Sequence, residues 1–157
     1  MQLQWLILGL GNLLLGDEGV GVHAARALIP LEFDHAVTIV EVGTAFLDVL
    51  PELAVADRIL IIDAMHGGDP PGSIYRIPLA QCHSKMQLAS LHGLDLQRVL
   101  YMAGNQKQPE AIVLGIEPLS IEWSMELSTP VRNALPALVQ TVCHEVKSAS
   151  MTPHGYA

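Results

Sequence analysis

The chain has few positively charged side chains. Eight Lys and Arg residues stand against sixteen Asp and Glu residues, which gives a formal net charge of −8 over 157 residues. A nucleic-acid-binding protein normally carries a basic face, and so few scattered basic residues do not form one. The composition therefore argues against a nucleic-acid partner, whereas a basic protein partner is permitted.

Cysteine is also scarce. Cys82 and Cys143 form no CxxC pair and no disulfide framework, so we expect two free, buried thiols in a cytoplasmic protein. Cys143 precedes His144 in a predicted helix, where adjacent side chains point in different directions. This placement argues against a catalytic dyad of these two residues.

Long apolar runs are missing, although 50% of the residues are apolar and the mean hydropathy is +0.37. No uninterrupted stretch reaches the roughly 20 apolar residues that a helix needs to cross a bilayer. Residues 1–16 carry no charged side chain, but two glutamines, an asparagine and three glycines interrupt them. No Lys or Arg precedes this stretch, so we expect neither a signal peptide nor a membrane span. The apolar composition instead indicates a largely buried parallel sheet.

Strand-like and helix-like segments alternate along the chain, and the length fits one domain. We expect strands at 3–9, 37–42, 58–63, 73–79 and 111–116, and helices at 18–29, 45–53, 93–103 and 130–147. Short connections and right-handed crossovers predict an α/β fold, a three-layer sandwich. Its sheet should be five-stranded, twisted and mostly parallel, with helices on both faces and 73–79 as an edge strand. The domain is expected over 1–147, followed by a disordered tail, 148–157.

Two further expectations concern the helix ends. Asp17 is placed to cap the first helix through its side chain. Pro136 lies inside the last predicted helix, where it removes a backbone hydrogen bond. We therefore expect a kink at Pro136 or a late start of that helix.

Two carboxylates come at the ends of apolar, strand-like runs. Glu18 follows the run in LILGLGNLLLGDEGVG (6–21), and Asp63 ends the run ILIID. Parallel strands direct their carboxyl ends to one sheet edge, where α/β proteins bind ligands, so these carboxylates are expected to meet. A helix-dipole charge for Glu18 and a turn former for Asp63 are the structural alternatives. Divalent metals take carboxylate and imidazole ligands, and three histidines lie in loops on the same side: His66, His83 and His92.

Other kinds of site are disfavoured because their sequence motifs are incomplete or missing. Gly9 and Gly11 start a dinucleotide fingerprint, and Glu41 at the end of the second strand could hold a ribose. However, Leu14 stands where the third glycine belongs, and the nearby acidic residues would repel a pyrophosphate. The sequence also contains no GK[ST] phosphate loop, no HExxH zinc motif and no GxSxG nucleophile elbow.

The string Gly9-x-Gly11-Asn12-x-Leu14-x-x-Asp17-Glu18-Gly19-x-Gly21 resembles the [NiFe] hydrogenase maturation endopeptidases. The resemblance spans roughly residues 3–147 and implies a three-layer sandwich of the phosphorylase/hydrolase-like kind. Further segments match that family in the same order: Asp63-Ala64, Ser90-Leu91-His92, Gly115-Ile116-Glu117-Pro118 and Leu127-Ser128-Thr129-Pro130. Some relatives carry Asp-Gly or Gly-Gly before the threonine of the turn after the second strand. Here the turn is Glu41-Val42-Gly43-Thr44, and its role is left open.

The resemblance implies a metal-dependent endopeptidase. Such an enzyme removes the carboxyl-terminal extension of a [NiFe] hydrogenase large-subunit precursor after nickel insertion. By the same resemblance, Glu18, Asp63 and His92 are the catalytic residues and the metal ligands. Nickel is then the cofactor and is delivered with the precursor, although other divalent metals can occupy the site. A metal polarises the peptide carbonyl and activates water, and a carboxylate can move the proton.

Three other functions are considered as alternatives. The first is a nickel-dependent chaperone that binds the precursor without cutting it. The second is a nucleotide-binding module, and the third is a relative with another peptide substrate, such as the spore-protease-like branch of this fold. Incubation with a loaded precursor separates the protease from the chaperone, because only a protease shortens the large subunit.

Overall fold

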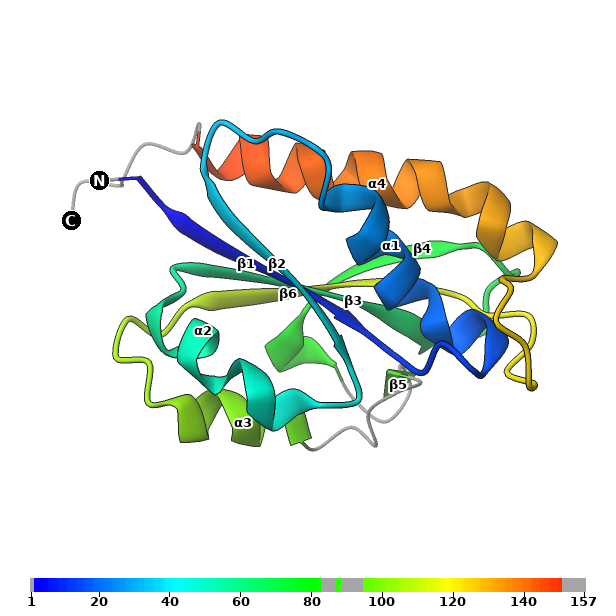
Figure 1. The fold of residues 1–157 in the computed structure, drawn as a ribbon, viewed down its shortest axis with the longest axis horizontal. Helices are drawn as coiled ribbons and strands as arrows, with labels where there is room; N and C mark the ends of the chain where they lie inside the picture. The colour runs from blue at the N-terminus through cyan, green and yellow to red at the C-terminus, as the bar shows by residue number, and fades with distance from the viewer. Residues whose placement is uncertain (1, 83–86, 89–94, 151–157) are drawn as a thin grey trace.

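The computed structural model describes residues 2–82, 87–88 and 95–150, and strands and helices alternate along them (Figure 1). The strands are β1 (Gln4–Leu10), β2 (Ala36–Gly43), β3 (Arg58–His66), β4 (Ile74–Pro78), β5 (Gln87–Leu88) and β6 (Glu110–Ile116). The α-helices are α1 (Val20–Leu28), α2 (Leu50–Val55), α3 (Asp95–Ala103) and α4 (Thr129–Ser150). Short 3₁₀ helices occur at η1 (Gly16–Gly19), η2 (Phe46–Val49) and η3 (Leu79–Gln81).

Five strands form the central sheet in the order β2-β1-β3-β6-β4, and β5 pairs with the end of β3. Strands β2, β1, β3 and β6 are parallel, whereas β4 runs antiparallel to β6 at the edge. This confirms the predicted sheet, including the edge position of the 73–79 segment. The register pairs Gly9 of β1 with Glu41 of β2 and Ile62 of β3. The last residues of these three strands therefore share one side of the sheet, named the carboxyl edge below.

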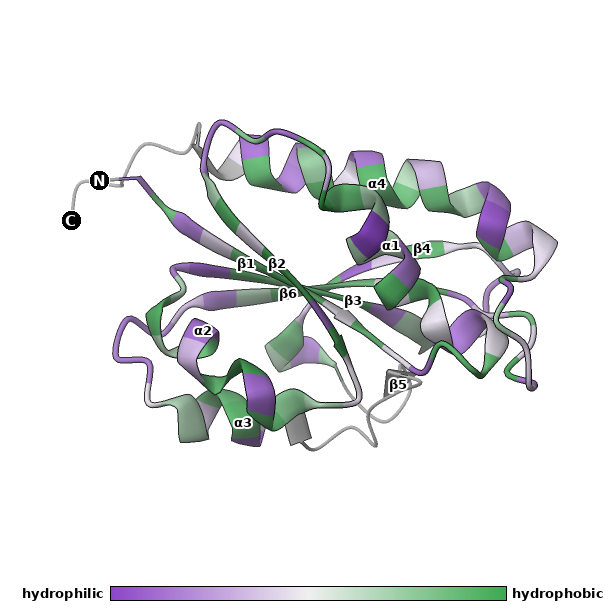
Figure 2. Ribbon diagram, viewed as in Figure 1, coloured by the Kyte–Doolittle hydropathy of each residue, from purple (hydrophilic) through white to green (hydrophobic). Residues whose placement is uncertain are grey.

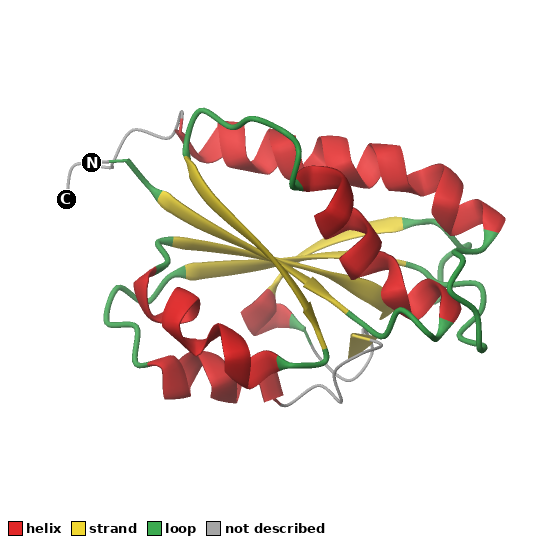
Figure 3. Cartoon of the chain, in the orientation of Figure 1, coloured by secondary structure: helices red, strands yellow, loops and turns green. Residues whose placement is uncertain are grey.

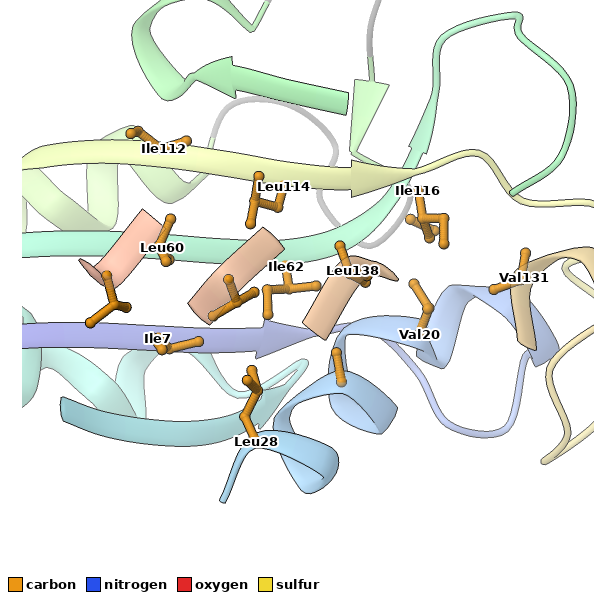
Figure 4. Packing of buried hydrophobic residues seen from close by; sticks show 14 of the residues in the cluster. Ile7, Val20, Leu28, Leu60, Ile62, Ile112, Leu114, Ile116, Val131 and Leu138 are labelled. Atoms are coloured by element: carbon orange, nitrogen blue, oxygen red, sulfur yellow. The ribbon is translucent and has the colours of Figure 1, made fainter. Parts of the chain in front are cut away.

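Helices cover both faces of the sheet, which gives the three predicted layers (Figure 3). On one face, α1 and α4 cover buried side chains such as Ile7, Leu60 and Leu114 (Figure 4). On the other face, α2 and α3 cover alternate strand positions such as Leu8 and Ile61. Successive side chains of a strand point to opposite faces, so a strand buried on both sides is apolar at most positions. Figure 2 shows this along the central strands, and it explains the high apolar content.

The first helix begins differently from the expectation. Residues 16–19 form the 3₁₀ turn η1, and α1 starts only at Val20. The N-cap positions of η1 and α1 belong to Leu15 and Gly19, and neither makes a side-chain cap hydrogen bond. The prediction that Asp17 caps this helix is therefore wrong. The physical reason is that its carboxylate binds partners from distant parts of the chain.

The last helix passes through Pro136 without a break, which excludes the late start. Helix α4 also continues to Ser150, beyond the predicted end of the domain at 147. The remainder of the predicted tail, 151–157, lies outside the described residues. Within the described part of the chain, no helix is both long and apolar enough to cross a membrane.

Candidate functional site

Helix α1 packs directly on the sheet because two glycines leave no side chain between them. A Cβ atom on Gly9 would lie 2.3 Å from the carbonyl oxygen of Gly21. A Cβ atom on Gly21 would lie 2.2 Å from the carbonyl oxygen of Ile62. Both glycines are therefore required by packing, which explains much of the glycine-rich string without a nucleotide. The close packing also brings η1, which carries Asp17 and Glu18, to the carboxyl edge (Figure 1).

Gly11 adjoins both of the predicted site carboxyl residues. Its φ of +118° belongs to a backbone conformation that side-chain-bearing residues rarely adopt. A Cβ atom on Gly11 would lie 1.7 Å from the carbonyl oxygen of Glu18 and 3.5 Å from Oδ1 of Asp63. The structure thus brings the backbone of Glu18 and the carboxylate of Asp63 to one place, although they are far apart in the sequence.

Asp63 is fully buried, and strand β3 continues beyond its predicted end at this residue to His66. Asp63 therefore lies within the strand, paired in register with Gly115 of β6. Its Oδ1 accepts a hydrogen bond of 2.8 Å from the N–H of Ala64, which orients the carboxylate. Burying a carboxylate is unfavourable unless donors or a cation surround it. Because Asp63 lies inside a strand, the turn-former alternative is wrong.

The three loop histidines separate into two cases. His66 is the last residue of β3, is exposed, and pairs in register with Gln87 of β5. His83 and His92 lie outside the described residues, so the predicted ligand set is located for Glu18 and Asp63 alone. Across residues 2–82, 87–88 and 95–150, no three His, Cys, Asp or Glu side chains gather as metal ligands.

Asp17 is a fully buried carboxylate that links η1 to the loop before α4. Its Oδ2 accepts hydrogen bonds from the N–H groups of Leu119 (2.9 Å) and Ser120 (3.0 Å) and from the hydroxyl of Ser128 (2.7 Å). Its Oδ1 accepts one from the N–H of Ser128 (2.8 Å). Burial raises the pKa of Asp17, but these hydrogen bonds outweigh burial and hold the pKa below its ordinary value. Asp17 is therefore an anion, and its hydrogen bonds hold η1, which also carries Glu18, against the loop before α4.

Glu117 forms a second buried link, directly after β6. Its Oε2 accepts hydrogen bonds of 2.7 Å from the hydroxyl of Tyr75 and from the N–H of Gly67. Burial and the Glu117 carboxylate raise the pKa of Tyr75, so its hydroxyl stays a neutral donor. The link holds the chain that leaves β3 against β4 and β6. In the sequence, Glu117 belongs to a segment that matches the family, but no local signal indicates its partners Tyr75 and Gly67.

The turn after β2 borders the same region. The carbonyl of Gly43 accepts a hydrogen bond of 3.0 Å from the N–H of Gly11. A cleft of about 250 Å³ lies between this turn and the loop after β1, and it is lined by Gly11, Asn12, Leu13, Val22 and residues 41–44. Glu41 is engaged by Arg26, with 3.0 Å between Oε1 and Nε. The turn 41–44, whose role the sequence left open, therefore lines one side of this cleft.

The two cysteines are free, as predicted, although they are partly rather than fully buried. Burial raises the pKa of the Cys82 thiol, so it is protonated at neutral pH and is not an activated nucleophile. The His144 ring lies 3.2 Å from the hydroxyl of Ser148 on the next turn of α4. Neither fact concerns a contact between Cys143 and His144, so the absence of that dyad stays a prediction.

The fold is that of an α/β protein with buried carboxyl residues, Asp17, Asp63 and Glu117, close to the carboxyl edge of its sheet. The family model described as hydrogenase maturation protease matches residues 22–145. The chain is also 35% identical over 152 residues to the hydrogenase expression/formation protein HupD of Rhizobium leguminosarum bv. viciae, an alignment that covers 91% of this chain and 74% of that protein. The chain therefore belongs to the hydrogenase maturation protease family.

Solved structures of similar proteins have the same fold. The hydrogenase maturating endopeptidase HybD of E. coli matches with a TM-score of 0.78 at 26% identity, over 94% of both chains. The [NiFe] hydrogenase maturation protease HybD of Thermococcus kodakarensis matches with a TM-score of 0.78 at 28% identity, over 92% of this chain and 99% of that one. These similarities confirm the α/β fold and favour a protease over the chaperone alternative.

Proposed function

We propose that this protein removes the carboxyl-terminal extension of a [NiFe] hydrogenase large-subunit precursor after nickel has been inserted. Membership of a maturation protease family supports the hydrolytic reaction and the hydrogenase large subunit as substrate. The observation that supports the proposed site is that the backbone of Glu18 and the carboxylate of Asp63 both lie beside Gly11. The third proposed member, His92, comes from the sequence resemblance and lies outside the described residues.

The donors of this site are chemically suited to a divalent cation. Asp63 is fully buried and Glu18 is half-buried, and a neighbouring cation would offset the unfavourable burial of their charge. Two carboxylates and one imidazole suit nickel and other divalent metals of borderline character. In this proposal the nickel ion is part of the loaded precursor, and Glu18, Asp63 and His92 bind it from the enzyme side.

Peptide hydrolysis needs a polarised carbonyl, a water nucleophile and a proton for the leaving amine. A bound cation supplies carbonyl polarisation and lowers the pKa of water. The proposed role of Glu18 and Asp63 is to orient the attacking water and to pass its proton to the leaving nitrogen. The N–H of Ala64 orients the Asp63 carboxylate, and the hydrogen bonds of Asp17 hold the turn that carries Glu18.

The substitution Asp63→Asn tests this function. It keeps the size of the side chain and removes its charge, so we expect cleavage to fall by about two orders of magnitude or more. The fold should persist, because little packing is lost. The measurement is mass spectrometry of the large subunit after incubation of each enzyme with purified, nickel-loaded precursor from the same organism. Circular dichroism of both enzymes checks the fold.

Asp34→Asn is a matched control. Asp34 is exposed and precedes β2 at the opposite edge of the sheet, so its loss should leave cleavage unchanged. Full activity of Asp63→Asn would remove Asp63 from the site. A wild-type enzyme that binds the loaded precursor without shortening it would point to the chaperone function instead.

A further inference from the structure

Four large apolar side chains are exposed around η1. Leu14 precedes this turn, and Leu119, Trp123 and Met125 belong to the loop between β6 and α4. Their exposed fractions are 45%, 59%, 79% and 64%, respectively. These four side chains are named the apolar rim. Large apolar side chains that gather on a surface are typical of a protein–protein contact.

The backbone holds the rim in a fixed position. The N–H of Ser124 donates to the carbonyl of Leu14 (3.0 Å), and the N–H of Gly16 donates to the carbonyl of Ser124 (2.8 Å). The N–H of Asp17 donates to the carbonyl of Ser120 (3.0 Å), and the Asp17 carboxylate accepts four more hydrogen bonds from the same loop. These hydrogen bonds fix the backbone of the loop before α4, so its apolar side chains stay exposed.

The rim lies next to the proposed site. Glu18 is in η1 itself, and its N–H donates to the carbonyl of Leu15 (3.2 Å). Leu15 in turn forms an isolated β-bridge with Ser124, between Trp123 and Met125 of the rim. Figure 1 shows the loop before α4, in yellow, beside the blue turn before α1. A polypeptide held on the rim is therefore close to Glu18.

Acidic side chains flank the rim. Glu122 is exposed in the same loop, and Glu126 is 84% exposed, with 3.7 Å between its Oε2 and an Arg132 nitrogen. A second copy of this chain would bring a net charge of −8 and the same two glutamates against this surface. Like charges across an interface are unfavourable, so a dimer through the rim is disfavoured. A partner with apolar side chains between Lys or Arg residues satisfies both features.

We propose that the apolar rim docks the large-subunit precursor, through an apolar segment with basic flanks close to the peptide bond that is cut. This inference rests on the proposed function and adds the substrate-binding surface to it. The rim residues are distinct from Glu18, Asp63 and His92. Substrate binding and peptide cleavage therefore depend on different residues, and substitutions can separate them.

The double variant Trp123→Ala with Met125→Ala tests the docking surface. We expect its KM for the nickel-loaded precursor to rise about tenfold or more, while kcat stays within about twofold of wild type. Trp123→Phe keeps an aromatic side chain and should restore most of the affinity. The measurement is the initial rate of large-subunit shortening over a range of precursor concentrations. Since both side chains are exposed, the fold should persist, and circular dichroism checks it.

The matched control is Tyr101→Ala with Met102→Ala. These side chains are 88% and 62% exposed on α3, which covers the other face of the sheet from α1 and α4. Kinetic constants equal to those of wild type are expected for this control.

The charge reversal Glu122→Lys with Glu126→Lys tests the acidic flanks. Like the Trp123 and Met125 variant, it should raise KM, and the increase should shrink at high salt because screening weakens the repulsion between like charges.

The outcomes are distinguishable. If the wild type cuts the loaded precursor and the Trp123 and Met125 variant has an unchanged KM, the docking proposal is overturned and the proposed function stands. If the wild type does not cut that precursor, the proposed function is overturned, and the docking proposal that rests on it is overturned with it. A wild-type dimer that dissociates in the rim variant, seen by light scattering, would assign the rim to a second copy and overturn the docking proposal. A fall in kcat at constant KM would also overturn it.

Discussion

Gly11 combines two constraints in one residue. Its φ is +118°, and an added Cβ atom would collide with the Glu18 carbonyl oxygen at 1.7 Å. We predict that Gly11→Ala lowers the free energy of unfolding by about 3 kcal/mol or more, because strain and overpacking add. Cleavage should also fall, since the turn that carries Glu18 must move away from Asp63. Urea unfolding followed by circular dichroism measures the first effect, and the shortening assay measures the second.

Gly104→Ala is the control that separates the effect of backbone strain from the effect of the steric clash in Gly11→Ala. Gly104 also has a positive φ, +65°, but nothing lies within 4 Å of the position its Cβ atom would take. This variant should lose about 1 kcal/mol of stability and keep normal cleavage. Equal effects in the two variants would mean that backbone conformation alone, and not contact with Glu18, requires the glycine at position 11.

Single residues differ in how far the sequence reveals their role. Glu18 and Asp63 could be placed at one edge because each follows an apolar run, and runs of that kind form parallel strands. Asp17 was misplaced because its partners are 102 to 111 residues away, and a local capping pattern cannot indicate such contacts. His92 stays a prediction, since it depends on resemblance and lies outside the described residues.

At the scale of elements, η1 and the loop before α4 are joined through the Asp17 carboxylate. The fold lowers the pKa of Asp17, so its ionised form stabilises the protein above the ordinary pKa of 3.8. That contribution is lost as the pH falls through the lowered pKa. We predict that Asp17→Asn loses about 3 kcal/mol at pH 7, and that the gap to wild type narrows below about pH 4. Urea unfolding of both proteins between pH 3 and pH 7 measures the gap.

Ser128→Ala is a milder variant for comparison with Asp17→Asn. It removes the hydroxyl donor and leaves three backbone N–H groups on the Asp17 carboxylate. The loss at pH 7 should be about 1 kcal/mol, smaller than for Asp17→Asn. A gap between wild type and Asp17→Asn that stays constant from pH 7 to pH 3 would contradict the stabilising role of the ionised carboxylate.

Element positions were largely predictable, and element ends were not. Apolar runs indicated the five strands of the central sheet, but β3 continues to His66 because it pairs there with β5, and a two-residue strand has no sequence pattern. Pro136 does not interrupt α4, which buries Val131 and Leu138 on either side of it against the sheet. Packing of that face offsets the missing hydrogen bond, a compensation that helix propensity does not include.

At the scale of the whole molecule, composition was informative because a doubly covered parallel sheet needs apolar residues on both faces. The order of strands and helices then indicated the edge at which a site is expected, since the parallel strands end there. Neither argument could reveal how loops close over that edge. The turn after β2, the Glu117 link and the apolar rim depend on contacts between segments that carry no shared pattern in the sequence.

The last prediction concerns the enzyme and its precursor together. A protein of net charge −8 that gathers carboxylates at one edge favours a cation-bearing partner there. We predict that a nickel-free precursor stays uncut while the nickel-loaded precursor is shortened by the same enzyme preparation. Mass spectrometry of each large subunit measures cleavage, and metal analysis verifies the loading. Asp63→Asn should cut the loaded form at least about two orders of magnitude more slowly than wild type. Cleavage of a demonstrably nickel-free precursor at the rate of the loaded one would contradict nickel gating while leaving the protease function intact.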